Sequence, residues 1–172
     1  MQNRTKALLF ILHCIKRTMM EKYITEILIV EDNPYEADLV KRCLKKLLPP
    51  ERVVHLDDGA EALDFIFAQG AYAYREGAGL PRLILLDIKV PKVSGIEILT
   101  RLRQNPKTAM LPVVMFSSSR ETRDLKDSYD NGANSYVVKP IDFTELENTI
   151  NALVKYWLDI NYFPSAGLTS EN

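Results

Sequence analysis

The sequence predicts an α/β fold, a doubly wound (βα)₅ domain in which five parallel strands alternate with helices that cover both faces of the sheet. Three observations support this prediction. Five short apolar segments are spread along the chain. Each is followed by a polar residue with a glutamate three positions later. The segments between them carry apolar residues at spacings of three and four, which is typical of helices that pack on a sheet.

The five apolar segments have the length and composition of β-strands. They cover residues 26–30, 52–56, 83–87, 113–116 and 135–138. The first, third and fourth are almost wholly apolar, as expected for strands that are covered on both faces. The second and fifth are shorter or contain polar residues, so we expect them at the edges of the sheet.

Each predicted strand is followed by a signal for the start of a helix. In a capping box, a short polar side chain accepts a hydrogen bond from the backbone amide three residues later. The side chain of a glutamate at that later position accepts a hydrogen bond from the amide of the capping residue. The five pairs are Asn33/Glu36, Asp58/Glu61, Ser94/Glu97, Ser118/Glu121 and Asp142/Glu145. One such pair is a weak signal, but five in register with five apolar segments are a strong one. We expect the last helix to extend to about Trp157, and segment 69–81 to be a loop or a frayed helix end.

The composition restricts the classes of function. The 22 basic and 23 acidic residues give a net charge of −1, which argues against nucleic acid or an anionic membrane as a partner. The apolar run 7–12 is too short to span a bilayer, so we predict no membrane span. Two cysteines provide no disulfide framework and indicate a reducing, cytoplasmic location. We expect an extension over 1–22 outside the core, one domain over 23–163 and a flexible tail over 164–172.

Polar side chains follow the ends of four predicted strands. In an open parallel sheet, ligands bind at the carboxyl ends of the strands, near the point where the strand order reverses. The residues at these positions are Glu31 and Asp32, Asp87, Ser117, and Lys139. Three carboxylates at close range repel one another, and a divalent cation relieves this repulsion. Caps on one helix would explain the first two acids, but not the side chains at the other strand ends.

These residues predict a magnesium-dependent phosphoryl site. Mg²⁺ takes about six oxygen ligands and often combines carboxylates with a phosphate oxygen. The predicted ligands are Glu31, Asp32, Asp87 and the backbone carbonyl of Lys89. Asp87 is a candidate nucleophile for a phosphoryl group, and Lys139 and Ser117 could hold phosphoryl oxygens. A phosphatase of the haloacid dehalogenase type would need a second acid where Lys89 stands, and no glycine-rich nucleotide-binding motif occurs.

The segment from about residue 23 to 157 resembles the receiver domain of two-component response regulators. The resemblance rests on "LIVEDN", "LILLDIKVPKVSG", "VVMFSSS" and "SYVVKP". It implies a flavodoxin-like sheet of order 2-1-3-4-5, Mg²⁺ as cofactor, and phosphorylation of Asp87 by a histidine kinase. It also implies a cis peptide bond before Pro140 and a switch through Tyr136, which would turn into space vacated when the phosphoryl group draws Ser117 inward. Such a protein is a phosphoacceptor with its own phosphotransfer and autodephosphorylation chemistry rather than an enzyme.

A closer resemblance is to small single-domain regulators associated with phytochromes. Its carriers are the insertion before the third strand, "SYDNGANSYVVKPID" and "KYWLDI". It implies a phytochrome-like photoreceptor kinase as a partner. The aromatic residues near the end of the chain favour a homodimer through the fourth helix, fifth strand and fifth helix, although Trp157 could simply pack on the core. The alternative function is a degenerate receiver that acts as a phosphorylation-independent scaffold.

Overall fold

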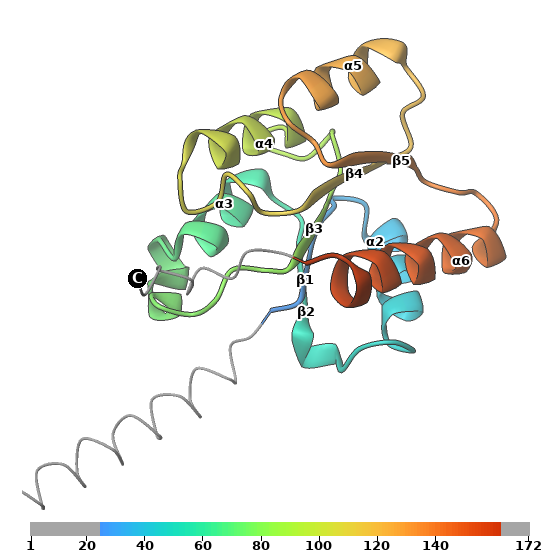
Figure 1. Ribbon diagram of the computed structural model, residues 1–172, viewed down its shortest axis with the longest axis horizontal. Helices are drawn as coiled ribbons and strands as arrows, with labels where there is room; N and C mark the ends of the chain where they lie inside the picture. Colours follow the sequence, from blue (N-terminus) through green and yellow to red (C-terminus); the bar gives the residue numbers. More distant parts are fainter. Residues whose placement is uncertain (1–24, 163–172) are drawn as a thin grey trace, which may run out of the picture.

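The computed structural model describes residues 25–162 of the chain. The predicted extension 1–22 and tail 164–172 therefore lie outside the described residues. The described part has three layers, with a central sheet between two sets of helices (Figure 1). Within residues 25–162, no helix is both long enough and apolar enough to cross a bilayer.

The sheet confirms the predicted fold class and strand order. Its strands are β1 (Ile27–Val30), β2 (Val53–Leu56), β3 (Leu83–Leu86), β4 (Val113–Ser117) and β5 (Ser135–Val138). All neighbouring pairs are parallel, and the order is β2-β1-β3-β4-β5. Every residue of β1, β3 and β4 is buried, whereas most of β2 and all of β5 are only partly buried. The less apolar segments therefore form the two edges, as predicted.

Among the described residues, four helices connect the strands, a fifth follows β5, and three shorter helical turns accompany them. The helices are α2 (Pro34–Leu44), α3 (Gly59–Phe67), α4 (Gly95–Gln104), α5 (Thr122–Asp130) and α6 (Phe143–Val154). The turns are η1 (Pro50–Arg52), η2 (Gly70–Arg75) and η3 (Lys155–Ile160). The predicted loop over 69–81 thus begins with a helical turn. The last helix extends beyond Trp157, as expected, although its final part is a π-helical turn.

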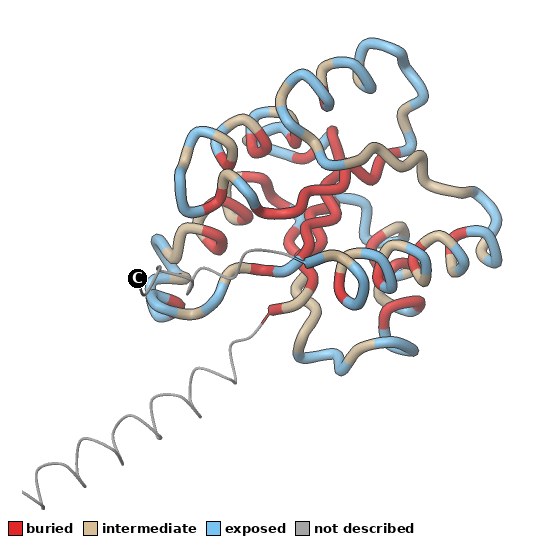
Figure 2. The backbone as a smooth tube through the Cα atoms, viewed as in Figure 1, coloured by how far each residue is buried: buried red, intermediate tan, exposed pale blue. Residues whose placement is uncertain are grey.

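Alternation along the central strands creates a core on each face of the sheet. In β1, Leu28 and Val30 pack in the cluster that includes α3 and α4, whereas Ile27 and Ile29 pack in the cluster that includes α2 and α6. The buried residues concentrate along the middle of the sheet, as Figure 2 shows. The rigid centre of the molecule therefore fixes the positions of the strand ends.

Four of the five predicted capping residues are confirmed. Asn33, Asp58, Ser94 and Asp142 each accept a hydrogen bond from the amide three residues later.

The prediction for Ser118 is wrong. Helix α5 begins at Thr122, and its capping residue Glu121 makes no side-chain cap. Ser119 takes the local role instead, because its hydroxyl accepts from the Glu121 amide at 3.3 Å and donates to Asp124 at 2.6 Å. The chain after β4 consequently makes a longer loop at the rim of the sheet before the helix starts.

Candidate functional site

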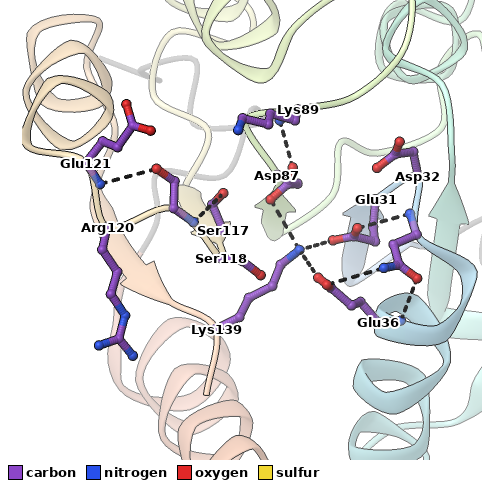
Figure 3. Close-up of a pocket in the computed structure, with 12 residues that line it drawn as sticks. Glu31, Asp32, Glu36, Asp87, Lys89, Ser117, Ser118, Arg120, Glu121 and Lys139 are labelled. Atoms are coloured by element: carbon purple, nitrogen blue, oxygen red, sulfur yellow. Dashed lines mark hydrogen bonds and ion pairs between the residues drawn. The ribbon is translucent and has the colours of Figure 1, made fainter. Parts of the chain in front are cut away.

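A pocket of about 480 Å³ lies at the carboxyl ends of the strands (Figure 3). The predicted site residues that line it are Glu31, Asp32, Asp87, Lys89, Ser117 and Lys139. They come from the ends of β1, β3, β4 and β5 and from the loops that follow. The parallel topology therefore brings together side chains that are up to 108 residues apart in the sequence.

Lys139 lies at the centre of the charged groups. Its backbone N–H donates to the Ser117 carbonyl at 2.9 Å, and its side chain is only 8% exposed. The ammonium contacts the Glu31 carboxylate, lies 2.6 Å from Glu36 Oε2 and lies 3.2 Å from Asp87 Oδ1. Burial lowers the pKa of Lys139, but the hydrogen bonds to Glu31 and Glu36 and the charge of Asp87 outweigh burial, so its pKa is raised. The lysine is therefore a fixed positive charge at neutral pH.

Glu31 follows β1 and points into the same cluster. Its backbone N–H donates to the Leu56 carbonyl at 3.0 Å, and its Oε1 accepts from the Asn33 amide at 3.1 Å. Burial raises the pKa of Glu31, and the nearby Asp87 raises it further, although Lys139 opposes both effects. The charged form of Glu31 is thus disfavoured by burial and by Asp87, and it is stabilised by its contact with Lys139.

Asp87 follows β3, and each of its two carboxylate oxygens has a partner. Its side chain is 9% exposed, its Oδ2 accepts from the Lys89 amide at 2.7 Å, and its Oδ1 faces Lys139. The loop closes where the Gly95 N–H donates to the Ile88 carbonyl at 3.0 Å. A Cβ atom at Gly95 would lie 2.1 Å from the Asp87 carbonyl oxygen, so only glycine permits this approach. The backbone of Asp87 thus packs directly against the start of α4.

Ser117 ends β4 with its side chain buried, and its hydroxyl accepts from the Ser119 amide at 3.4 Å. Tyr136 is not a pocket residue. Its hydroxyl donates to the Ser119 carbonyl at 3.0 Å, and its ring packs against the core cluster that includes α3 and α4. The ring is therefore partly buried and tied to the loop after β4 in this structure, and its movement on phosphorylation stays a prediction.

The predicted cis peptide bond before Pro140 is wrong, because no peptide bond between residues 25 and 162 is cis. The direction of the Lys139 side chain instead follows from its backbone hydrogen bond to Ser117 and from its three carboxylate partners.

The acids suit a divalent cation by their chemistry, because carboxylate and carbonyl oxygens are the ligands that Mg²⁺ and Mn²⁺ prefer. However, within residues 25–162 no group of three or more acidic, histidine or cysteine side chains is arranged around a common metal position. The Lys139 ammonium contacts both Glu31 and Asp87, and Asp32 is exposed at the rim (Figure 3). The ammonium thus neutralises oxygens that a metal would need. The donor set fits a cation, provided that Lys139 releases these two carboxylates.

Sequence reasoning missed Glu36 as a pocket residue. It was assigned only to the capping box of α2, in which its amide donates to Asn33 Oδ1 at 3.4 Å. Its own carboxylate instead accepts from the Asn33 side-chain amide at 3.3 Å and from Lys139. The sequence did contain a signal for this role, because Glu36 lies in the first helical turn after the acidic pair Glu31 and Asp32.

Comparisons with known proteins agree with this architecture. Residues 27–151 match the response regulator receiver domain. The probable methanogenesis regulatory protein FilR2 of Methanothrix harundinacea is 38% identical over 140 residues, which cover 80% of this chain and 86% of that protein. The response regulator Rcp1 of Synechocystis is 34% identical over 140 residues, which cover 81% of this chain and 93% of that protein.

Two crystal structures resemble the fold at 33% identity. The phosphorylated cyanobacterial phytochrome response regulator RcpA has a TM-score of 0.75 and covers 83% of this chain and 99% of its own. The Mn²⁺-bound form of Rcp1 has a TM-score of 0.72 and covers 81% of this chain and 98% of its own. The chain therefore belongs to the response regulator receiver domain family, with single-domain phytochrome-associated regulators among its close relatives.

Proposed function

We propose that this protein is a single-domain response regulator that accepts a phosphoryl group from a histidine kinase on Asp87. The observation that carries the proposal is the buried Lys139 ammonium, which lies 3.2 Å from Asp87 Oδ1 at the end of β3. A buried cation is costly unless it is paired, and here it stands where phosphoryl oxygens would need a counter-charge. The coverage of nearly all of RcpA and Rcp1 supports the single-domain form.

The residues of the pocket have separate roles in the transfer. An oxygen of Asp87 attacks the phosphorus of a phosphohistidine, so a P–O bond forms while the P–N bond breaks and the imidazole leaves. The Lys89 amide holds one carboxylate oxygen at 2.7 Å and thereby orients the nucleophile. Lys139 pairs with a phosphoryl oxygen, and the buried Ser117 hydroxyl donates to another. Attack of water on the same phosphorus would later restore the carboxylate, so the protein is a phosphoacceptor rather than a turnover enzyme.

The predicted metal ligands are part of this proposal. Glu31, Asp32, Asp87 and the Lys89 carbonyl would hold Mg²⁺, and the Mn²⁺-bound structure of Rcp1 supports a divalent cation in this family. The cation, when bound, would neutralise charge on the phosphoryl oxygens. The chain's own contribution is the convergence of these oxygens in one pocket.

The proposed partner is a phytochrome-like histidine kinase, because RcpA is a phytochrome response regulator. We place the reaction in the cytoplasm, in keeping with the free, buried Cys43.

Phosphorylation can be tested with acetyl phosphate and Mg²⁺, followed by intact-protein mass spectrometry. We expect the wild-type protein and the surface control Asp127→Asn to gain one phosphoryl group, and Asp87→Asn to gain none. Labelling of Asp87→Asn would reject the proposed acceptor. If neither acetyl phosphate nor a phytochrome-like kinase labels the wild-type protein, the scaffold alternative is favoured.

A homodimer through α5, β5 and α6 is the second part of the proposal. Tyr129, Tyr156 and Ile160 are about half exposed on these elements or on the turn that follows them. A groove of about 500 Å³ runs between β5 and α6, and Trp157 lines it while also packing against the core. Exposed apolar side chains beside an open strand edge favour association.

Light scattering tests the dimer. We expect the wild-type protein to have the particle mass of a dimer and Tyr156→Glu to have that of a monomer. Tyr35→Glu adds the same charge at another exposed tyrosine and should leave the protein a dimer. A monomeric wild-type protein, or a dimer that survives Tyr156→Glu, would contradict this interface.

A further inference from the structure

We propose that Glu36 is a positioning residue that provides an alternative carboxylate for the Lys139 ammonium when a divalent cation binds in the pocket. In this role Glu36 strengthens cation binding without touching the cation. The inference rests on the proposed function, because it assumes that the strand-end acids bind a divalent cation.

The contacts of Lys139 are the first step. An ammonium has three N–H donors, and three different carboxylates surround this one. Two of them, Glu31 and Asp87, are proposed metal ligands, so the cation and the ammonium compete for the same oxygens. Glu36 is the third partner, at 2.6 Å, and it is not a proposed ligand.

Burial is the second step. The side chains of Lys139 and Glu31 are 8% and 7% exposed, whereas that of Glu36 is 36% exposed. A buried ammonium that loses all its partners is strongly destabilised. Because Glu36 remains available, Lys139 can give up the other two carboxylates and still keep one charged partner. Glu36 therefore lowers the cost of admitting the cation.

The position of Glu36 is the third step. It lies in the first turn of α2, where Asn33 caps the helix and its side-chain amide donates to Glu36 Oε1 at 3.3 Å. Its other oxygen, Oε2, faces Lys139 (Figure 3). One carboxylate thus joins the helix cap to the lysine, which fixes its place beside the pocket. The contact to Lys139 distinguishes this role from simple helix capping.

A double-mutant cycle tests whether Glu36 acts through Lys139. Mg²⁺ affinity is measured by isothermal titration calorimetry for the wild-type protein, Glu36→Gln, Lys139→Met and the double variant. We expect Glu36→Gln to weaken Mg²⁺ binding about fivefold in the wild-type background, a size typical of coupling between contacting charged groups. In the Lys139→Met background we expect a change of less than about twofold, because the competing ammonium is gone.

Glu121→Gln is the matched control. It removes a carboxylate from the same pocket, but Glu121 is not among the three partners of Lys139. We expect it to change the affinity by less than about twofold. Circular dichroism melting of each variant separates a loss of fold from a loss of binding.

Two outcomes would overturn the inference alone. Equal weakening by Glu36→Gln in both backgrounds would mean that Glu36 acts only as a nearby negative charge. An unchanged affinity in the wild-type background would leave it only a capping role. Both outcomes leave phosphorylation of Asp87 intact, so they differ from a failure of the proposed function. If the wild-type protein bound no Mg²⁺, the metal part of the proposed function and the role of Glu36 would both be rejected.

Discussion

Gly95→Ala should disturb the phosphoacceptor without changing a pocket side chain. Gly95 is the first residue of α4, and a Cβ atom there would lie 2.1 Å from the carbonyl oxygen of Asp87 and 3.0 Å from its carbonyl carbon. Side-chain carbons do not approach other atoms more closely than 3.0 Å. The added methyl group and the Asp87 backbone must therefore separate by about 0.9 Å, the difference between these two distances.

The size of both effects follows from this displacement. Forcing an extra carbon into a packed region costs about 1–3 kcal/mol, and 1 kcal/mol corresponds to about 2–4 °C in Tm for a domain of this size. Misplacing a reacting group by about 1 Å can lower a rate about 100-fold. The displaced oxygen is the backbone carbonyl oxygen of Asp87, so its movement also shifts the side chain that accepts the phosphoryl group. We therefore expect the rate of labelling of Gly95→Ala by acetyl phosphate to fall by up to about 100-fold.

The assay combines a thermal melt with the rate of labelling, followed by mass spectrometry. Gly79→Ala is the neutral control, because nothing lies within 4 Å of a Cβ atom there. Gly59→Ala is the control for stability, because its Cβ atom would lie 1.9 Å from the Val93 carbonyl oxygen rather than against Asp87. We expect it to lower Tm with a smaller effect on labelling. Wild-type labelling and an unchanged Tm in Gly95→Ala would refute the reasoning.

Three further predictions concern stability, measured by urea unfolding. Leu85→Ala, at a position 2% exposed, should cost about 2–5 kcal/mol, whereas Ile141→Ala, at a position 97% exposed, should change the free energy of unfolding by less than about 0.5 kcal/mol. Arg103→Met should cost about 2 kcal/mol, because the guanidinium donates to two backbone carbonyls and one side-chain amide oxygen. Asp58→Asn keeps a capping residue but removes the ion pair with Lys92. The hydrogen bond from Lys92 lowers the pKa of Asp58 below its ordinary 3.8, so the wild-type advantage should be present above pH 3.8 and disappear as the pH falls through the lowered pKa.

The strands could be predicted because a buried parallel strand requires a nearly continuous apolar segment, whereas their full order was implied by the resemblance to receiver domains. The edges could be predicted for the same reason, since β2 and β5 need apolar side chains at fewer positions. The start of α5 could not, because Ser118 and Ser119 are adjacent residues of similar capping ability. The path of the loop after β4 decides between them, and that path depends on Tyr136, which donates to the Ser119 carbonyl.

The acids at the strand ends could be predicted because parallel topology alone brings those positions together. Glu36 could not, since a capping box explains the residue locally and its partner Lys139 is 103 residues away. The set of three carboxylates that contact Lys139 likewise depends on how the pocket folds. Sequence therefore indicated which charges meet, but not which of them pair with one another.

The charge of the whole pocket gives these pairings a common reason. Its lining contains five acidic and three basic side chains, a net charge of −2 when all are ionised. A divalent cation would balance this charge. Phosphorylation of Asp87 would then replace the −1 of its carboxylate with about −1.5 to −2 on the phosphoryl group, a net change of about −0.5 to −1 at neutral pH. Lys89 and Arg120 are exposed at the rim, whereas Lys139 is buried. The two exposed side chains can therefore move freely when ligands bind, and Lys139 cannot. When a cation or a phosphoryl group binds, the buried Lys139 can only exchange one carboxylate partner for another group. Its partners, including Glu36, should therefore control how tightly the pocket binds a cation and a phosphoryl group.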